Sequence, residues 1–140
     1  MSLFNVMSIS SKGMEAESVR LNTTASNIAN ANSVSSSYDE TYKARHPVFA
    51  AELARATEDQ SKGVGVRVMG VVESDAPLQM EYAPNNPLAD ENGYIYKPNV
   101  NVVEEMANMM SASKAYETNV QVADTTKKIF RRVLQLGQGQ

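Results

Sequence analysis

The sequence predicts a mainly α-helical protein with a small β region. Long N- and C-terminal helices are expected to pair as a coiled-coil-like unit, with a short irregular β insertion between them. Apolar residues recur every three or four positions along both ends of the 140-residue chain, which is typical of helices that pack against other helices. All five prolines lie between these ends, in a segment where valines alternate with other residues as in strands. We therefore expect three parts, at residues 1–32, 33–100 and 101–140.

The first predicted helix carries two rows of residues with heptad spacing, which together form one stripe. The large row is Met7, Met14, Leu21 and Ile28, and the mostly small row is Phe4, Ser11, Ser18 and Ala25. Small residues in one row would let a partner helix come close. The other faces carry Ser, Asn and Thr more often than Lys and Glu, so this helix alone in water should be marginal. The composition also fits permanent disorder, but a helix that folds on assembly accounts for the heptad as well.

The middle part shows strand and turn signals separated by loop residues. These signals are a flexible break at 33–37, a weak strand at 42–53 interrupted by Pro47, a strand at 64–72, an alternation at 78–82, and an Asn-Gly pair at 92–93. We expect the strands at 42–53 and 64–72 to pair. We expect the Asn-Gly pair to form a hairpin turn between Leu88 and the segment 94–96.

The last predicted helix is the clearest element of the sequence. Asn101 is expected to cap it, with Glu104 three residues on as in a capping box. Its stripe consists of Val102, Met106, Met109, Ser113, Tyr116, Val120, Ala123, Phe130 and Leu134. Cations at 127, 128, 131 and 132 suit the negative end of the helix dipole, and Gly137 is the expected stop signal. About 35 residues give a helix of roughly 52 Å, too long to be buried in a compact body of this size.

Composition excludes several classes of function. A formal charge of −3 offers no electrostatic attraction for nucleic acid or an anionic membrane surface. Without cysteine there are no disulfides, zinc fingers or thiol nucleophiles. The start of the sequence has no basic region with an apolar run, so we expect no classical signal peptide. No stretch approaches the roughly 20 apolar residues of a membrane span, so direct membrane insertion is not expected.

No residue pattern predicts catalysis or cofactor binding. His46 is the only histidine, and without a second histidine or a cysteine it cannot build a zinc site. The glycines at 63 and 65 resemble the start of a dinucleotide-binding loop, but Val68 replaces the third glycine and a strand follows. The methionines at 80, 106, 109 and 110 could suggest a soft metal, but at helical spacing they favour interface packing. We expect no cofactor and no metal.

Two blocks of the sequence resemble the bacterial flagellar axial proteins, the family of rod, hook and hook-associated proteins. The first is Leu-Asn-Thr-Thr-Ala-Ser-Asn-Ile-Ala-Asn-Ala-Asn at 21–32, and the second comprises motifs at 86–90, 92–94, 98–100, 105–106 and 113–119. The short length leaves no room for the inserted domains of hook and distal-rod members. The segment 42–49 (Tyr-Lys-Ala-Arg-His-Pro-Val-Phe) resembles the short proximal-rod members of the family.

The resemblance implies a structural subunit of the basal-body rod, which polymerises through its terminal helices and transmits motor torque. It implies export by the flagellar type III apparatus without a cleaved signal, and a place in the periplasmic rod. The implied partners are copies of the chain, other rod proteins and the export apparatus. We assign helix-packing and assembly roles to Phe4, Met7, Met14, Leu21, Ala25, Ile28, Val102, Met106, Met109, Tyr116, Val120, Ala123, Phe130 and Leu134. The alternative is a soluble binding or chaperone-like module of the export system.

Overall fold

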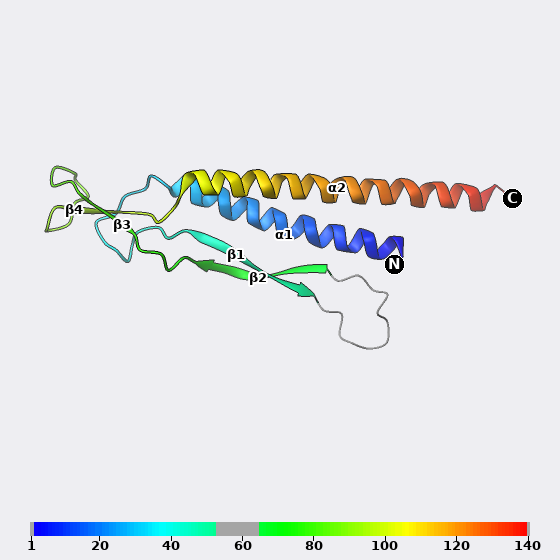
Figure 1. Ribbon diagram of the computed structural model, residues 1–140, viewed down its shortest axis with the longest axis horizontal. Coiled ribbons are helices and arrows are strands. Elements are labelled where there is room, and N and C mark those ends of the chain that lie inside the picture. The colour runs from blue at the N-terminus through cyan, green and yellow to red at the C-terminus, as the bar shows by residue number, and fades with distance from the viewer. Residues whose placement is uncertain (1, 53–64, 140) are drawn as a thin grey trace.

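A computed structural model describes residues 2–52 and 65–139. Helix α1 (Leu3–Asn30) and helix α2 (Val102–Gln138) lie side by side and antiparallel, and they give the molecule its elongated shape (Figure 1). With 28 and 37 residues, these helices are about 42 and 56 Å long. The C-terminal end of α2 therefore projects beyond the start of α1 (Figure 1). The predicted class, mainly α with a small β region, is confirmed.

Side-chain caps fix where both helices begin. The Ser2 hydroxyl accepts a hydrogen bond from the Asn5 backbone N–H at 3.3 Å. The predicted cap at Asn101 is confirmed, because its Oδ1 accepts from the N–H groups of Val103 and Glu104. The predicted stop at Gly137 is wrong, since α2 continues to Gln138. Gly137 does not adopt the positive φ that would end the helix in a left-handed cap.

Strands β1 (Arg45–Glu52) and β2 (Gly65–Glu73) pair as predicted, and the pair is antiparallel, with Arg45 opposite Glu73. The register shifts between Val48 and Phe49, which leaves Met69 of β2 without an opposite residue. Both strands contact α1, which lies between this hairpin and α2 (Figure 1). Leu53 and Val64, at the ends of the predicted strands, lie outside the described residues.

Strands β3 (Gln79–Tyr82) and β4 (Tyr94–Lys97) form a second antiparallel pair at the far end of the molecule (Figure 1). The predicted turn at 92–93 is present, because the Gly93 N–H donates to the Asp90 carbonyl at 3.0 Å. The prediction that the segment at Leu88 pairs with residues 94–96 is wrong. This segment lies in a turn in which the Leu88 N–H donates to Asn86 Oδ1 at 2.9 Å, and β3 pairs with β4 instead.

The sequence predicts a flexible break at the serine run 33–37. In the structure, hydrogen bonds hold this segment in place after α1. Ser35 and Tyr96 exchange two backbone hydrogen bonds of 3.0 Å each, and Ser33 Oγ donates to the Asn30 carbonyl at 2.8 Å. The run therefore connects the end of α1 to β4.

The buried residues of the two helices are small or polar. The buried residues of α1 are Ser10, Ala16, Thr23, Thr24 and Asn27, and those of α2 are Glu105, Ala112 and Thr126. At Gly13 the helices come so close that an added Cβ would lie 2.8 Å from Asn119 Nδ2. Close helix packing thus leaves the large apolar side chains outside the centre of the pair.

Candidate assembly surface

Asn27 is the polar centre that joins α1, α2 and the β1–β2 hairpin. Its side chain is fully buried. Its Nδ2 donates to the Arg45 carbonyl at 2.8 Å and to Glu105 Oε2 at 3.0 Å. Its Oδ1 accepts from Tyr42 Oη at 2.8 Å and from the Arg45 N–H at 2.9 Å. Every hydrogen-bonding position of the amide is used, so the side chain fixes three elements at one point.

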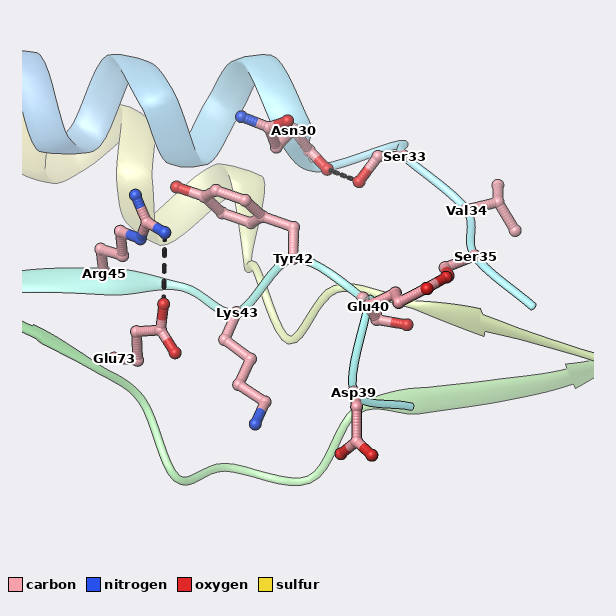
Figure 2. Close-up of a pocket in the computed structure, with 11 residues that line it drawn as sticks. Asn30, Ser33, Val34, Ser35, Asp39, Glu40, Tyr42, Lys43, Arg45 and Glu73 are labelled. Atoms are coloured by element: carbon pink, nitrogen blue, oxygen red, sulfur yellow. Dashed lines mark hydrogen bonds and ion pairs between the residues drawn. The ribbon is translucent and has the colours of Figure 1, made fainter. Parts of the chain in front are cut away.

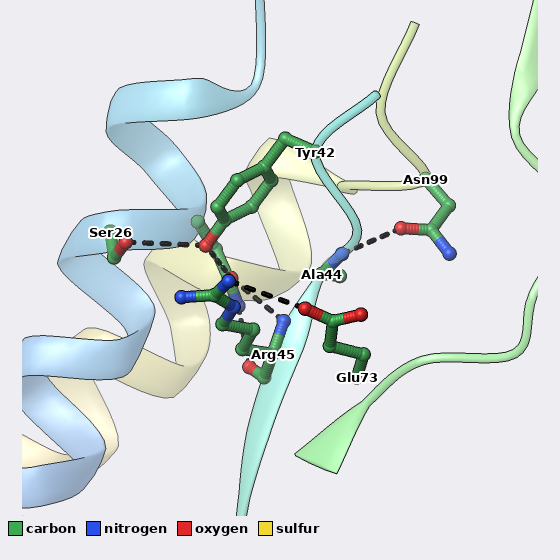
Figure 3. A network of polar contacts seen from close by, with 7 residues as sticks. Ser26, Tyr42, Ala44, Arg45, Glu73 and Asn99 are labelled. Atoms are coloured by element: carbon green, nitrogen blue, oxygen red, sulfur yellow. Dashed lines mark hydrogen bonds and ion pairs between the residues drawn. The ribbon is translucent and has the colours of Figure 1, made fainter. Parts of the chain in front are cut away.

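Asn99, in the loop before α2, makes a second set of bonds beside this centre. Its Oδ1 accepts from the Ala44 N–H at 2.7 Å (Figure 3). Its Nδ2 donates to the carbonyls of Ala76 at 2.7 Å and Ser74 at 3.3 Å. Both ends of the β1–β2 hairpin are thereby attached to the segment that leads into α2.

The start of β1 is held by side-chain contacts around the same point. Arg45 pairs with Glu73 across the strands at 3.2 Å, and Tyr42 Oη lies 3.2 Å from Ser26 Oγ (Figure 3). The Arg45 guanidinium also lies over the Tyr42 ring, 5.5 Å from its centroid. Because the ion pair is half exposed, it contributes little to stability. The buried amide bonds of Asn27 matter more.

A cleft of about 450 Å³ opens beside this centre, between the end of α1 and the start of β1 (Figure 2). Its lining mixes the acids Asp39, Glu40 and Glu73 with the cations Lys43 and Arg45. The Ser33 hydroxyl in the cleft is used in its bond to the Asn30 carbonyl, and no histidine lines the cleft. The cleft therefore has no serine–histidine pair of the kind that many hydrolytic sites use.

The structure offers no metal centre in residues 2–52 and 65–139, because no group of three or more His, Asp or Glu side chains lies close enough there. His46 is exposed on β1, opposite Val72. In the same part of the chain, no helix has an apolar stretch long enough to cross a membrane.

The predicted large row of α1 lies at the margin of the helix pair. The residues that face α2 are Gly13, Arg20 and Asn27, which meet Asn119, Asn108 and Glu105. Met14, Leu21 and Ile28 of the predicted large row each come one position after one of these residues. Each therefore lies about 100° further around the helix axis. Met14, Leu21 and Ile28 are consequently half-buried, whereas Met7 and Ala25 are exposed. Phe4 packs edge-on against Phe130, with ring centroids 5.3 Å apart, yet stays 67% exposed.

The predicted stripe of α2 is displaced in the same way. The row that faces α1 is Glu105, Ala112, Asn119 and Thr126. Met109, Ala123 and Phe130 are half-buried at its edge. Val102, Met106, Tyr116, Val120 and Leu134 are exposed. Small and polar residues occupy the centre of the contact, and the two predicted stripes lie at its edge, where only Phe4 and Phe130 are seen to pack ring against ring.

The predicted set also missed apolar residues that are more exposed than any in it. Val103 and Met110 are 77% and 75% exposed, and Leu136 is 80% exposed. They belong to further rows of seven-residue spacing, Val103–Met110 and Val122–Ile129–Leu136. This spacing is visible in the sequence and could have identified them. We use the name outward apolar rows for these two rows together with the predicted residues Phe4, Met7, Met14, Leu21, Ile28, Met106, Tyr116, Val120 and Leu134.

Charges on the C-terminal part of α2 pair along the helix. Lys128 Nζ lies 2.8 Å from Asp124 Oδ2. The hydrogen bond and charge of Lys128 hold the pKa of the Asp124 carboxyl below its ordinary value, with smaller contributions from Lys127 and Arg131. The pair is fully solvated, so it supports helix formation only locally.

An elongated helix pair with a small polar interior and outward apolar rows is typical of structural subunits that pack against other chains. Family models agree with this class. Residues 7–35 match the model described as flagella basal body rod protein, and residues 91–136 match the model described as flagellar basal body rod FlgEFG protein C-terminal.

Curated relatives cover the whole chain. The flagellar basal-body rod protein FlgC of Salmonella typhimurium is 46% identical over 138 residues, covering 99% of this chain and 100% of the relative. The FlgC protein of Escherichia coli O6:H1 is 44% identical with the same coverage, and that of Buchnera aphidicola from Acyrthosiphon pisum is 34% identical over 140 residues. The chain belongs to the FlgC family of flagellar basal-body rod proteins.

Proposed function

We propose that this chain is a structural subunit of the bacterial flagellar rod and assembles through the outward apolar rows of its two terminal helices. The observation that carries the proposal is that the side chains of these rows are exposed or, at Met14, Leu21 and Ile28, only half-buried at the margin of the contact between α1 and α2. A large aliphatic side chain contributes about 1.5–3 kcal/mol when it is fully buried. Several such side chains on one subunit therefore give a strong drive to pack against neighbours.

The assembled partners are copies of this chain and other rod proteins, to which the flagellar type III apparatus delivers it without a cleaved signal. The rod lies in the periplasm.

Residues 1–32 and 101–140 form the axial core in this proposal, and residues 33–100 form the β-rich middle region. Helices of 28 and 37 residues, joined to each other and to the β1–β2 hairpin at Asn27, are suited to transmit torque. The role is structural and needs neither catalysis nor a cofactor.

Fractionation of basal bodies tests this function against the chaperone-like alternative. A tagged copy of the full chain would replace the native copy in a motile strain, and hook–basal bodies would be purified and probed for the tag. We expect the chain in the purified rod and loss of rod completion when it is deleted. A chain found only in the soluble fraction of a motile strain would contradict the structural role and support a chaperone-like one.

A further inference from the structure

Asp90 stabilises the turn that connects β3 to β4, because its carboxylate and its backbone carbonyl both accept hydrogen bonds there. Its carboxylate Oδ1 accepts from the N–H groups of Asn92 at 2.9 Å and Tyr94 at 2.8 Å. Its backbone carbonyl accepts from the Gly93 N–H at 3.0 Å. Asn92 is exposed, and its side-chain amide makes no hydrogen bond with any residue in the described part of the chain. The side chain is thus free, while the backbone around it is fixed.

Gly93 cannot readily be replaced in this turn. Its φ is +83°, a conformation that L side chains rarely adopt. An added Cβ would also lie 2.9 Å from Tyr82 Cε2 and 3.2 Å from Pro84 Cβ. The fold therefore requires glycine directly after Asn92.

An asparagine followed by glycine is open to a spontaneous reaction of the backbone. The deprotonated nitrogen of Gly93 attacks Cγ of Asn92 to form a new C–N bond, and the side-chain nitrogen leaves as ammonia. The five-membered succinimide then takes up water at either carbonyl, which yields aspartate or isoaspartate. Glycine favours the attack because it has no Cβ to hinder it.

In the folded chain the attacking atom is occupied. The hydrogen of Gly93 N points to the Asp90 carbonyl, which disfavours its removal. The hydrogen bonds of the turn also restrain the backbone on both sides of the Asn92–Gly93 bond, which limits the rotation that ring closure needs. Unfolding of the β3–β4 connection would remove both restraints.

We propose that Asn92 is a site of spontaneous deamidation, which the Asp90 turn suppresses in the folded protein. The modification therefore records how long a molecule has spent with the β3–β4 connection unfolded. Isoaspartate adds a methylene to the backbone within the turn and places a new carboxylate beside Asp90 and Glu91. This product should break the bond of 2.8 Å from the Asp90 N–H to the Tyr94 carbonyl and loosen the β3–β4 pair.

Peptide mapping of the full chain tests this proposal independently of any role in assembly. The purified protein would be incubated in mildly alkaline buffer, with and without urea, and analysed by mass spectrometry and by an isoaspartate methyltransferase assay. We expect Asn92 to be the main deamidated position in urea and to react severalfold more slowly in the folded chain. Asn92→Gln should remove the signal.

Variants of Asp90 test the protection itself. Asp90→Ala should raise the folded rate towards the rate in urea, whereas Asp90→Asn retains an acceptor oxygen and should keep the reaction slow. Absence of deamidation at Asn92 in urea would overturn the assignment of the site. Equal rates in the folded and urea-treated wild-type chain would overturn the protective role of the turn. Asp90→Ala keeps the backbone carbonyl that binds Gly93 N–H, so no acceleration in this variant would overturn the part of the Asp90 carboxylate in that protection.

Discussion

Asn27→Ala is expected to destabilise the folded chain by about 3 kcal/mol or more, since several buried polar groups lose their partner at once. The variant leaves the N–H and carbonyl groups of Arg45, the Tyr42 hydroxyl and the Glu105 carboxylate without the amide that they bind. Urea unfolding followed by circular dichroism would measure the loss. Amide exchange should show the β1–β2 hairpin opening first, because Asn27 joins it to the helices.

Asn30→Ala is the matched control for this prediction. Asn30 lies on the same helix, but its amide donates only to the Ser26 carbonyl one turn earlier, so the expected loss is below about 1 kcal/mol. Asn27→Asp separates hydrogen bonding from side-chain volume. It keeps the shape but cannot donate, and it places a carboxylate about 3 Å from Glu105 at the cited contact. Equal stabilities of the Asn27→Ala and Asn30→Ala variants would contradict the central role of Asn27.

Leu21→Asp is expected to abolish rod assembly and swimming while the chain is still produced. Leu21 lies on the half-buried margin of the helix pair, so the isolated chain should keep its helices. Packing against a neighbouring subunit would then bury an unpaired carboxylate, which typically costs several kcal/mol. Motility in soft agar and the content of purified basal bodies are the measurements.

Asn22→Asp provides the control for the added charge. It introduces the same group on the same turn of α1, at an exposed position about two turns from the exposed Glu15, which is already charged. This variant should swim. If the Leu21→Asp strain also swam normally, Leu21 would not lie in a packed contact of the rod.

Local signals in the sequence identified most of the secondary structure. The Asn101 cap, the apolar periodicity of both ends and the alternating valines of β2 each act within a few residues, so they can be interpreted without tertiary information. Pairing of β1 with β2 also followed, because few other strands were available. The pairing of β3 with β4 could not be predicted in this way, because the sequence does not reveal that Asn86 turns the chain near Leu88.

The sequence shows less clearly which face of each helix contacts the other helix. On both helices, two rows of residues that lie one position apart have the same seven-residue spacing. The sequence favours pairing through the larger side chains, because large apolar residues are usually the buried ones. The structure buries Asn27 against Glu105 instead, and these residues are 78 positions apart in the sequence. A polar contact of this kind is favourable only when both partners and the hairpin are in place. Asn27 belongs to the asparagine-rich block at 21–32, but the sequence alone does not show that this side chain is buried.

Thiol accessibility before and after assembly tests the outward apolar rows most directly. The chain has no cysteine, so Met7→Cys and Met106→Cys each introduce a single reactive group at an exposed position. Ala16→Cys serves as the control. Ala16 is a buried residue of α1, so its thiol should be protected from labelling in both states. Maleimide labelling would be compared between the isolated chain and purified basal bodies. We expect the thiols at 7 and 106 to react rapidly in the isolated chain and to be protected in the rod. Equally rapid labelling in both states would contradict assembly through these rows.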